Sequence, residues 1–180
     1  MRILKEDTLL IIVDVQERLF PYIAENIKLS QSIIKLLEGI KVFDIPVFLT
    51  EQYKKGLGET IPEVKSTINP DFIYEKLAFS CCDEPVFMQK LEATGKRNII
   101  LCGIESHICI LQTTIDLIKN NFQPILVEDC VSSRKLTDKQ FAVDRMRQEG
   151  AIVTTYESVL FELCRFAGTD QFKAIAKIIK

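Results

Sequence analysis

The sequence contains a single histidine, His107, and its six cysteines never occur in a Cys-x-x-Cys spacing. A catalytic zinc ion usually takes three protein ligands from histidine, cysteine or carboxylate side chains. One histidine cannot supply the histidine pair that many such sites use. Cys81 and Cys82 are adjacent, a spacing more typical of packing than of ligation. We therefore expect no bound metal.

Glycine is also scarce, with seven residues in 180. The first strand-like run is followed by DVQERLF, which lacks the glycines that let a backbone approach a pyrophosphate. Gly56 and Gly58 have no third glycine at the required spacing, and the Gly95-Lys96 pair has no upstream phosphate-loop glycine. We interpret all of these as turn glycines and predict no nucleotide or other cofactor.

A basic excess and a long apolar run are missing as well. The formal net charge is −2, which gives no basic surface for nucleic acid. No apolar run approaches the roughly 20 residues needed to cross a bilayer. The N-terminal residues show no secretory signal. We expect a cytoplasmic protein that binds neither nucleic acid nor a membrane, and whose six cysteines are free thiols.

Strand-like apolar runs alternate with amphipathic helical patterns along the chain. Strands are expected at 8–13, 46–50, 71–76, 98–102, 124–128 and 151–155. Helices are expected at 24–43, 62–68, 83–93, 106–120, 137–149, 158–166 and 171–179, with a loop at 51–60. This alternation predicts one α/β domain over residues 1–180. It has three α/β/α layers around a doubly wound, six-stranded, mostly parallel sheet of Rossmann-like type.

One common strand order for such a sheet is 3-2-1-4-5-6, in which strands 1 and 4 are neighbours and ligands bind beyond their carboxyl ends. Asp14 closes strand 1, and Cys109 follows strand 4 in the first turn of a helix. If that order holds, both residues face the same crevice.

Each of these two residues has a structural and a chemical interpretation. A carboxylate that closes an apolar strand either caps the next helix or serves as a general base. A thiol in the first turn of a helix is either a buried structural cysteine or a nucleophile, because the helix dipole there favours the thiolate. A dyad of Cys109 with His107 is disfavoured, since residues i and i+2 do not share a helix face.

Lys76 ends the third strand. In the order above, that strand lies two strands away from the crevice, so spacing alone does not bring Lys76 to Asp14. Taken by itself, Lys76 has the pattern of a solvated surface lysine.

Three segments, LLIIVDVQERLF, IYEKLAFSC and ILCGIESHICILQT, together resemble the isochorismatase-like cysteine hydrolases. The resemblance continues through TEQYKKGLGETIPE, VEDCVSSR and the C-terminal residues, which look like the subgroup of isochorismatase domain-containing proteins. It covers nearly the whole chain and implies the isochorismatase-like hydrolase fold.

The resemblance implies a catalytic triad of Asp14, Lys76 and Cys109. Cys109 would be the nucleophile, Asp14 would take its proton and later activate water, and Lys76 would hold the carboxylate and stabilise developing charge. The resemblance also implies a cis peptide bond at Ile104–Glu105. That bond would aim the backbone N–H groups of Glu105 and Cys109 into an oxyanion hole.

The same resemblance limits the reactions that we expect this chain to catalyse. Nicotinamidases of this family hold a metal through an aspartate and histidines after strand 2, whereas LTEQYKKGLGE contains no histidine. True isochorismatases can lack the cysteine that is present here. The implied reaction is hydrolysis of a small amide, ureide or ester through a thioester, with the substrate left unnamed.

Gln16, Phe20, Tyr53 and Phe79 flank these positions, and we expect them to line a pocket for a small-molecule substrate. The aromatic residues among them would otherwise belong to the core. Two other functions stay open: a catalytically silent binding or scaffold protein, and a redox sensor that works through Cys109. Because symmetric assembly is common, we expect a homo-oligomer, either a dimer or a tetramer.

Overall fold

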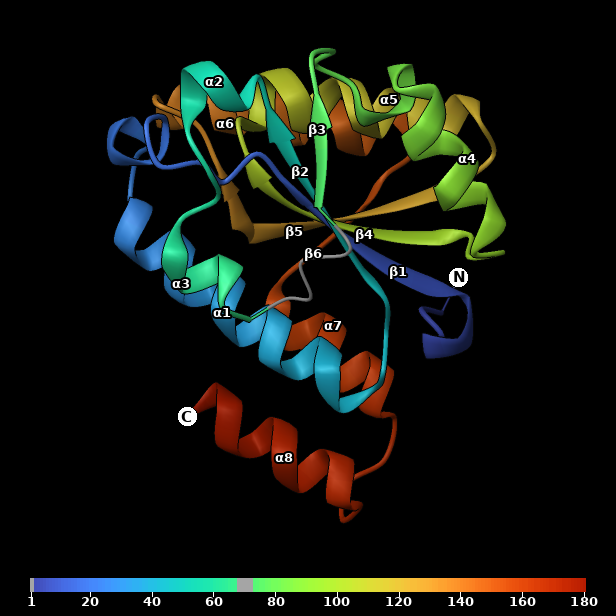
Figure 1. Ribbon diagram of the computed structural model, residues 1–180. Coiled ribbons are helices and arrows are strands. Elements are labelled where there is room, and N and C mark those ends of the chain that lie inside the picture. Colours follow the sequence, from blue (N-terminus) through green and yellow to red (C-terminus); the bar gives the residue numbers. More distant parts are fainter. Residues whose placement is uncertain (1, 68–72) are drawn as a thin grey trace.

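The computed structural model describes residues 2–67 and 73–180, and it consists of a central sheet with helices on both faces (Figure 1). All neighbouring strands are parallel, in the order β3-β2-β1-β4-β5-β6. The strands are β1 (Thr8–Val13), β2 (Val47–Gln52), β3 (Ile73–Lys76), β4 (Asn98–Ile104), β5 (Gln123–Ser132) and β6 (Ile152–Thr154). The predicted fold class is confirmed, and the strands take the order on which the meeting of Asp14 and Cys109 was conditional.

The helices form two layers, which Figure 1 shows above and below the sheet. One layer holds α1 (Asn26–Val42), α3 (Pro62–Lys65) and α7 (Tyr156–Cys164), with α8 (Asp170–Ile179) packed against α1 and α7. The other layer holds α4 (Pro85–Ala93), α5 (Leu111–Lys119) and α6 (Leu136–Glu149), and the short α2 (Lys54–Leu57) follows β2. Within the described ranges, none of the helices has the length and apolar character that a membrane crossing requires.

The central strand β1 supplies side chains to both cores. Leu10 and Ile12 pack with α1 and α7, whereas Leu9, Ile11 and Val13 pack with α4, α5 and α6. All six residues of β1 are buried, which is why the strand is a continuous apolar run instead of an alternating one. A shift of one residue would exchange the side chains on the two faces of β1, so the register of this strand is strongly specified. The same register fixes the position of Asp14, the residue that follows β1.

Several elements differ from the predicted ranges. β2 continues two residues past the predicted end, because the polar Glu51 and Gln52 find internal hydrogen-bond partners. The predicted loop 51–60 contains α2, and the predicted helix 106–120 opens with a π-helical turn at Ser106–Ile110. Of the predicted strand 71–76, residues 71 and 72 lie outside the described residues, as does residue 68 at the end of the predicted helix 62–68.

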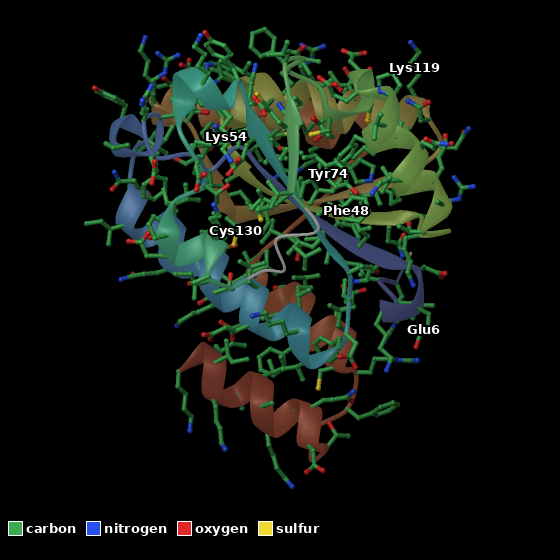
Figure 2. The ribbon with its side chains drawn as sticks, viewed as in Figure 1. Glu6, Phe48, Lys54, Tyr74, Lys119 and Cys130 are labelled. Carbon is green, nitrogen blue, oxygen red and sulfur yellow. The ribbon has the colours of Figure 1, made fainter. Side chains whose placement is uncertain are left out.

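An aromatic cluster fixes the edge strand β3 against the sheet and α4. The rings of Phe48 and Tyr74, both labelled in Figure 2, have centroids 5.5 Å apart, and Phe87 of α4 meets them at 5.8 and 5.4 Å. Tilted and edge-on ring pairs at such distances contribute stability beyond their buried area. Because Lys76 is the last residue of β3, this packing also positions Lys76.

Gly103 in β4 is fixed by its neighbour in β1. It pairs with Val13, and its φ is +121°. A Cβ at this position would lie 2.1 Å from the Val13 carbonyl oxygen, which is backbone and cannot move aside. Only glycine lets β1 and β4 approach this closely at the ends that carry Asp14 and Glu105.

We expect Gly103→Ala to lower the free energy of unfolding by more than about 3 kcal/mol, because a backbone clash adds to the cost of a positive φ. Gly150→Ala is the matched control, since Gly150 has a φ of +111° and open space around its Cβ position. The control should cost only about 1 kcal/mol. Urea denaturation of both variants would measure the difference in the free energy of unfolding. Equal losses in the two variants would show that the close approach of β1 and β4 does not exclude a side chain at residue 103.

Candidate active site

Asp14 follows β1 and is buried at the carboxyl edge of the sheet, with only 1% of the residue exposed. Its Oδ1 accepts a hydrogen bond from the Thr50 hydroxyl at 2.7 Å, and its Oδ2 accepts one from Lys76 Nζ at 2.7 Å. The carboxylate therefore binds one side chain from β2 and one from β3. It does not cap α1, which begins at Asn26.

Lys76 reaches Asp14 across the intervening strand β2. The spacing of residues in the sequence did not predict this contact. Two inter-strand steps of about 4.8 Å separate the strands, and the lysine and aspartate side chains together cover this gap. Nζ also donates to the carbonyl oxygens of Ala78 at 3.0 Å and Phe79 at 3.1 Å. All three ammonium protons therefore have acceptors.

The charge state of Lys76 follows from two opposing effects. Burial acts to lower the pKa of Lys76, the nearby negative charge of Asp14 acts to raise it, and the net direction is upward. The group is therefore an ammonium ion at neutral pH, and the pair is a buried salt bridge. Removing one partner of such a pair typically costs about 3–5 kcal/mol, because it leaves an uncompensated charge in the interior.

Cys109 lies in the π-helical turn that follows β4, and 5% of the residue is exposed. Its thiol donates to Gln52 Oε1, with Sγ and Oε1 3.0 Å apart. Gln52 ends β2, and its backbone N–H donates to Gln16 Oε1 at 2.8 Å. Strands β1, β2 and β4 thus bring Asp14, Gln52 and Cys109 to one edge of the sheet.

The environment of Cys109 favours the protonated thiol. Burial raises the pKa of the Cys109 thiol far above its ordinary value, the Asp14 carboxylate raises it further, and the Lys76 ammonium lowers it. This direction runs against the expectation that the start of the helix would favour a thiolate. Desolvation is the largest effect on the pKa of this thiol, and it disfavours the charged form. The thiol proton stays on sulfur, close to a carboxylate that could accept it.

The Ile104–Glu105 peptide bond is cis, as the family resemblance implied. The Glu105 carboxylate is buried, and its Oε2 accepts hydrogen bonds from the Arg134 backbone N–H at 3.0 Å and from Arg134 Nε at 3.1 Å. This ion pair anchors the turn between β4 and Cys109 to the segment that follows β5. The predicted oxyanion hole of Glu105 and Cys109 backbone N–H groups remains a prediction.

A cavity of about 170 Å³ opens between Asp14 and Cys109. Its walls are mostly apolar and come from the last residues of β2 and β4 and from the segments that follow β1, β2, β3 and β4. The lining residues are Asp14, Leu19, Gln52, Leu57, Phe79, Ile104, Glu105, Ile108 and Cys109.

Of the four residues predicted to line a pocket, Phe79 lies at this cavity and the other three lie elsewhere. Gln16 is buried and does not line the cavity, and its Nε2 donates to the carbonyl oxygens of Gln52 and Gly58. Phe20 packs against the α1 side of the core. Tyr53 is 52% exposed and precedes α2, and its backbone N–H donates to the Lys76 carbonyl oxygen.

His107 does not pair with Cys109 but with Ser133, whose hydroxyl oxygen lies 2.9 Å from His107 Nδ1. This agrees with the argument that residues two apart do not share a helix face. In residues 2–67 and 73–180, no three histidine, cysteine, aspartate or glutamate side chains are grouped as metal ligands would be.

Sequence reasoning missed Thr50, Gln52 and Arg134, although a signal existed for the first two. Both lie at the carboxyl end of β2, the strand beside β1, and polar residues at that edge face the crevice of a doubly wound sheet. Arg134 carried no such signal, because its role depends on how the chain returns after β5.

Comparison with known proteins decides the family. The sequence model of the Isochorismatase domain matches residues 8–158 of this chain. The chain belongs to the isochorismatase domain family. Isochorismatase domain-containing protein 2A of Mus musculus is 39% identical over 181 residues, which cover 99% of this chain and 85% of that protein.

Two solved structures extend the likeness to three dimensions. The MAR1 ribonuclease of Caenorhabditis elegans is 36% identical and superimposes with a TM-score of 0.93, covering 99% of this chain and 92% of that one. The YcaC gene product of Escherichia coli, described as an octameric hydrolase of unknown specificity, is 26% identical with a TM-score of 0.93, covering 99% and 89%. The fold is therefore the isochorismatase-like hydrolase fold.

We expect the alkylation rate of Cys109 to keep rising with pH up to pH 9 and beyond, because its pKa is raised and little thiolate exists at neutral pH. Asp14→Asn removes a negative neighbour, lowers the pKa of the thiol and should speed labelling several-fold at pH 8. Lys76→Met removes a positive neighbour and should slow it. Peptide mass spectrometry of iodoacetamide-treated protein would report each rate.

The fully buried Cys102 and Cys130 provide an internal control, because they become reactive only if a variant unfolds. A labelling rate that levels off below pH 8 would contradict the prediction and indicate a preformed thiolate.

Proposed function

We propose that this protein is a cysteine hydrolase that acts on a small amide, ureide or ester through Cys109, Asp14 and Lys76. The observation that carries the proposal is the buried Asp14–Lys76 ion pair beside a buried thiol at the wall of a small cavity. Such a pair is costly to bury, and strongly shifted groups around a cavity are typical of active sites.

In the proposed acylation step, sulfur attacks the substrate carbonyl carbon while the thiol proton passes to Asp14. The raised pKa of Cys109 favours this coupling, because it disfavours a free thiolate before substrate binds. Thr50 and Lys76 hold one oxygen each of the Asp14 carboxylate, so the base is held in a fixed orientation. Since all three Lys76 protons are engaged, its charge acts on the developing oxyanion through space.

The backbone N–H groups of Glu105 and Cys109 are proposed to receive the oxyanion. An oxyanion-hole donor is typically worth about 2.7–4 kcal/mol in the transition state. When the tetrahedral species collapses, Asp14 returns its proton to the leaving group, and a thioester to Cys109 remains. Asp14 then takes a proton from a water molecule that hydrolyses the thioester, which restores the thiol.

The rival functions find less support. A redox sensor needs a low-pKa, accessible thiol, whereas burial raises the pKa of Cys109. The C. elegans relative is described as a ribonuclease. RNA cleavage by this chain would need a binding surface for phosphates, and the formal net charge is −2. A catalytically silent binding protein remains the main alternative and is distinguished by turnover.

We also propose that the protein forms a homo-oligomer. Several large apolar side chains are exposed, among them Phe141 at 77%, and the E. coli relative is described as octameric. Light scattering should give a mass at least twice the 20.6 kDa of one chain. A mass of one chain at micromolar concentration would refute this proposal.

We expect Cys109→Ala to reduce hydrolysis by at least about 10³-fold, because removal of a nucleophile leaves only binding and oxyanion stabilisation. The assay is turnover of a panel of small amides, ureides and esters, with a short RNA oligonucleotide included. Cys164→Ala is the control, because Cys164 lies on α7, away from the cavity. It should keep turnover within about twofold.

Hydrolysis that survives in folded Cys109→Ala protein would exclude the thioester mechanism. Cleavage of RNA alone would replace the proposed substrate class.

A further inference from the structure

We propose that the cavity takes a small, uncharged primary amide with an apolar acyl group, and that Gln52 recognises the amide nitrogen. The chemistry of this step rests on the proposed function, but the choice of ligand rests on the walls of the cavity. Three features carry it: the size and polarity of the cavity, the pairing of every charge beside it, and the hydrogen bonds of Gln52.

The cavity suits a compact, largely apolar group. Its volume of about 170 Å³ is well below the roughly 300 Å³ at which pockets for drug-sized ligands begin. Five of its nine lining residues are apolar: Leu19, Leu57, Phe79, Ile104 and Ile108. A short branched or straight hydrocarbon chain on the carbonyl carbon would cover these walls.

The charges at the cavity leave no partner for an ionised substrate. Asp14 is paired with Lys76, and Glu105 is paired with Arg134. Among the lining residues no side chain is cationic, and Lys76 beside them spends its three protons on Asp14 and two carbonyl oxygens. A carboxylate or phosphate bound here would be a buried charge without compensation, which is strongly unfavourable.

Gln52 supplies the polar contact that remains. Its Oε1 accepts the thiol proton of Cys109 at 3.0 Å, and its Nε2 donates to the Leu77 carbonyl oxygen at 3.3 Å. Two hydrogen bonds to Gln16 hold its backbone. Because Nε2 donates one of its two protons to the Leu77 carbonyl oxygen, Oε1 is the amide atom that faces Cys109, and it is an acceptor.

The reaction frees that acceptor. When sulfur bonds to the carbonyl carbon and the thiol proton passes to Asp14, Oε1 loses its donor. The amide nitrogen is one bond from the carbon under attack, so its N–H can replace the thiol as the donor to Oε1. As the C–N bond breaks, the Asp14 proton moves to nitrogen and ammonia leaves. Water then releases the acid, so amide and water give carboxylic acid and ammonia. An ester or a ketone has no N–H to offer, and a polar site left unpaired discriminates strongly.

Three molecules of one shape test this without requiring turnover. Isobutyramide, isobutyrate and 3-methyl-2-butanone differ only in carrying NH₂, O⁻ or CH₃ on the carbonyl carbon. Titration calorimetry with Cys109→Ala protein should show isobutyramide binding at least tenfold more tightly than either of the other two. In the double variant that adds Gln52→Met, the preference for the amide over the ketone should fall below threefold.

Gln140→Met in the same Cys109→Ala background is the matched control, because Gln140 is on α6 and bonds to Asp144. It should keep the full preference. Equal or tighter binding of isobutyrate, an unchanged preference after Gln52→Met, or no binding of isobutyramide would overturn the inference.

Wild-type turnover separates this inference from the proposed function. If isobutyramide binds selectively but is never hydrolysed, the proposed hydrolase function is excluded and the inference that the cavity binds a primary amide stands. If the protein instead hydrolyses amides that carry a carboxylate in preference to uncharged ones, the hydrolase function stands and the inference of an uncharged ligand is overturned.

Discussion

The ion pair between Asp14 and Lys76 is the constraint around which the site is built. The two side chains meet 2.7 Å apart, and each is 1% exposed. Neither charge could be buried alone, and the pair is possible only because β3, β2 and β1 end at the same edge with Thr50 between them. The doubly wound topology therefore does more than support the chain, because it brings Asp14 and Lys76 close enough for both charges to be buried as a pair. The aromatic packing of Phe48, Tyr74 and Phe87 serves the same purpose, since it holds the edge strand that carries Lys76.

Before substrate binds, each charged group at the site is paired with an opposite charge. Asp14 and Lys76 neutralise each other, Glu105 is paired with Arg134, and burial raises the pKa of Cys109 so that its thiol is neutral. Under the proposed mechanism, charge develops only when sulfur attacks. Preorganised dipoles and a fixed ion pair are most effective in that situation, because they stabilise the transition state more than the ground state.

The walls of the cavity are held by backbone hydrogen bonds instead of by packing alone. The segment after β2 is tied to the segment after β1 by bonds from Glu17 to Glu59 and from Arg18 to Leu57, and Gln16 links both to Gln52. Leu57 and Gln52 thus belong to one hydrogen-bonded unit with the residues after Asp14.

By itself, the sequence determined the α/β class, and it brought Asp14 and Cys109 to one edge only on the condition that the strands take the order 3-2-1-4-5-6. The class follows from local periodicity, and the handedness of parallel crossovers limits the possible strand orders. The structure settles which order the strands take. The family resemblance added Lys76 and the cis bond at Ile104–Glu105. Only the tertiary structure decided that Lys76 spans β2, that Gln52 accepts a hydrogen bond from the thiol, and that Gln16 and Tyr53 lie off the cavity. It also buries Cys109, which raises the pKa of the thiol. Those outcomes depend on the reach of side chains across strands and on desolvation. Both are properties of the packed interior, and no stretch of sequence contains them.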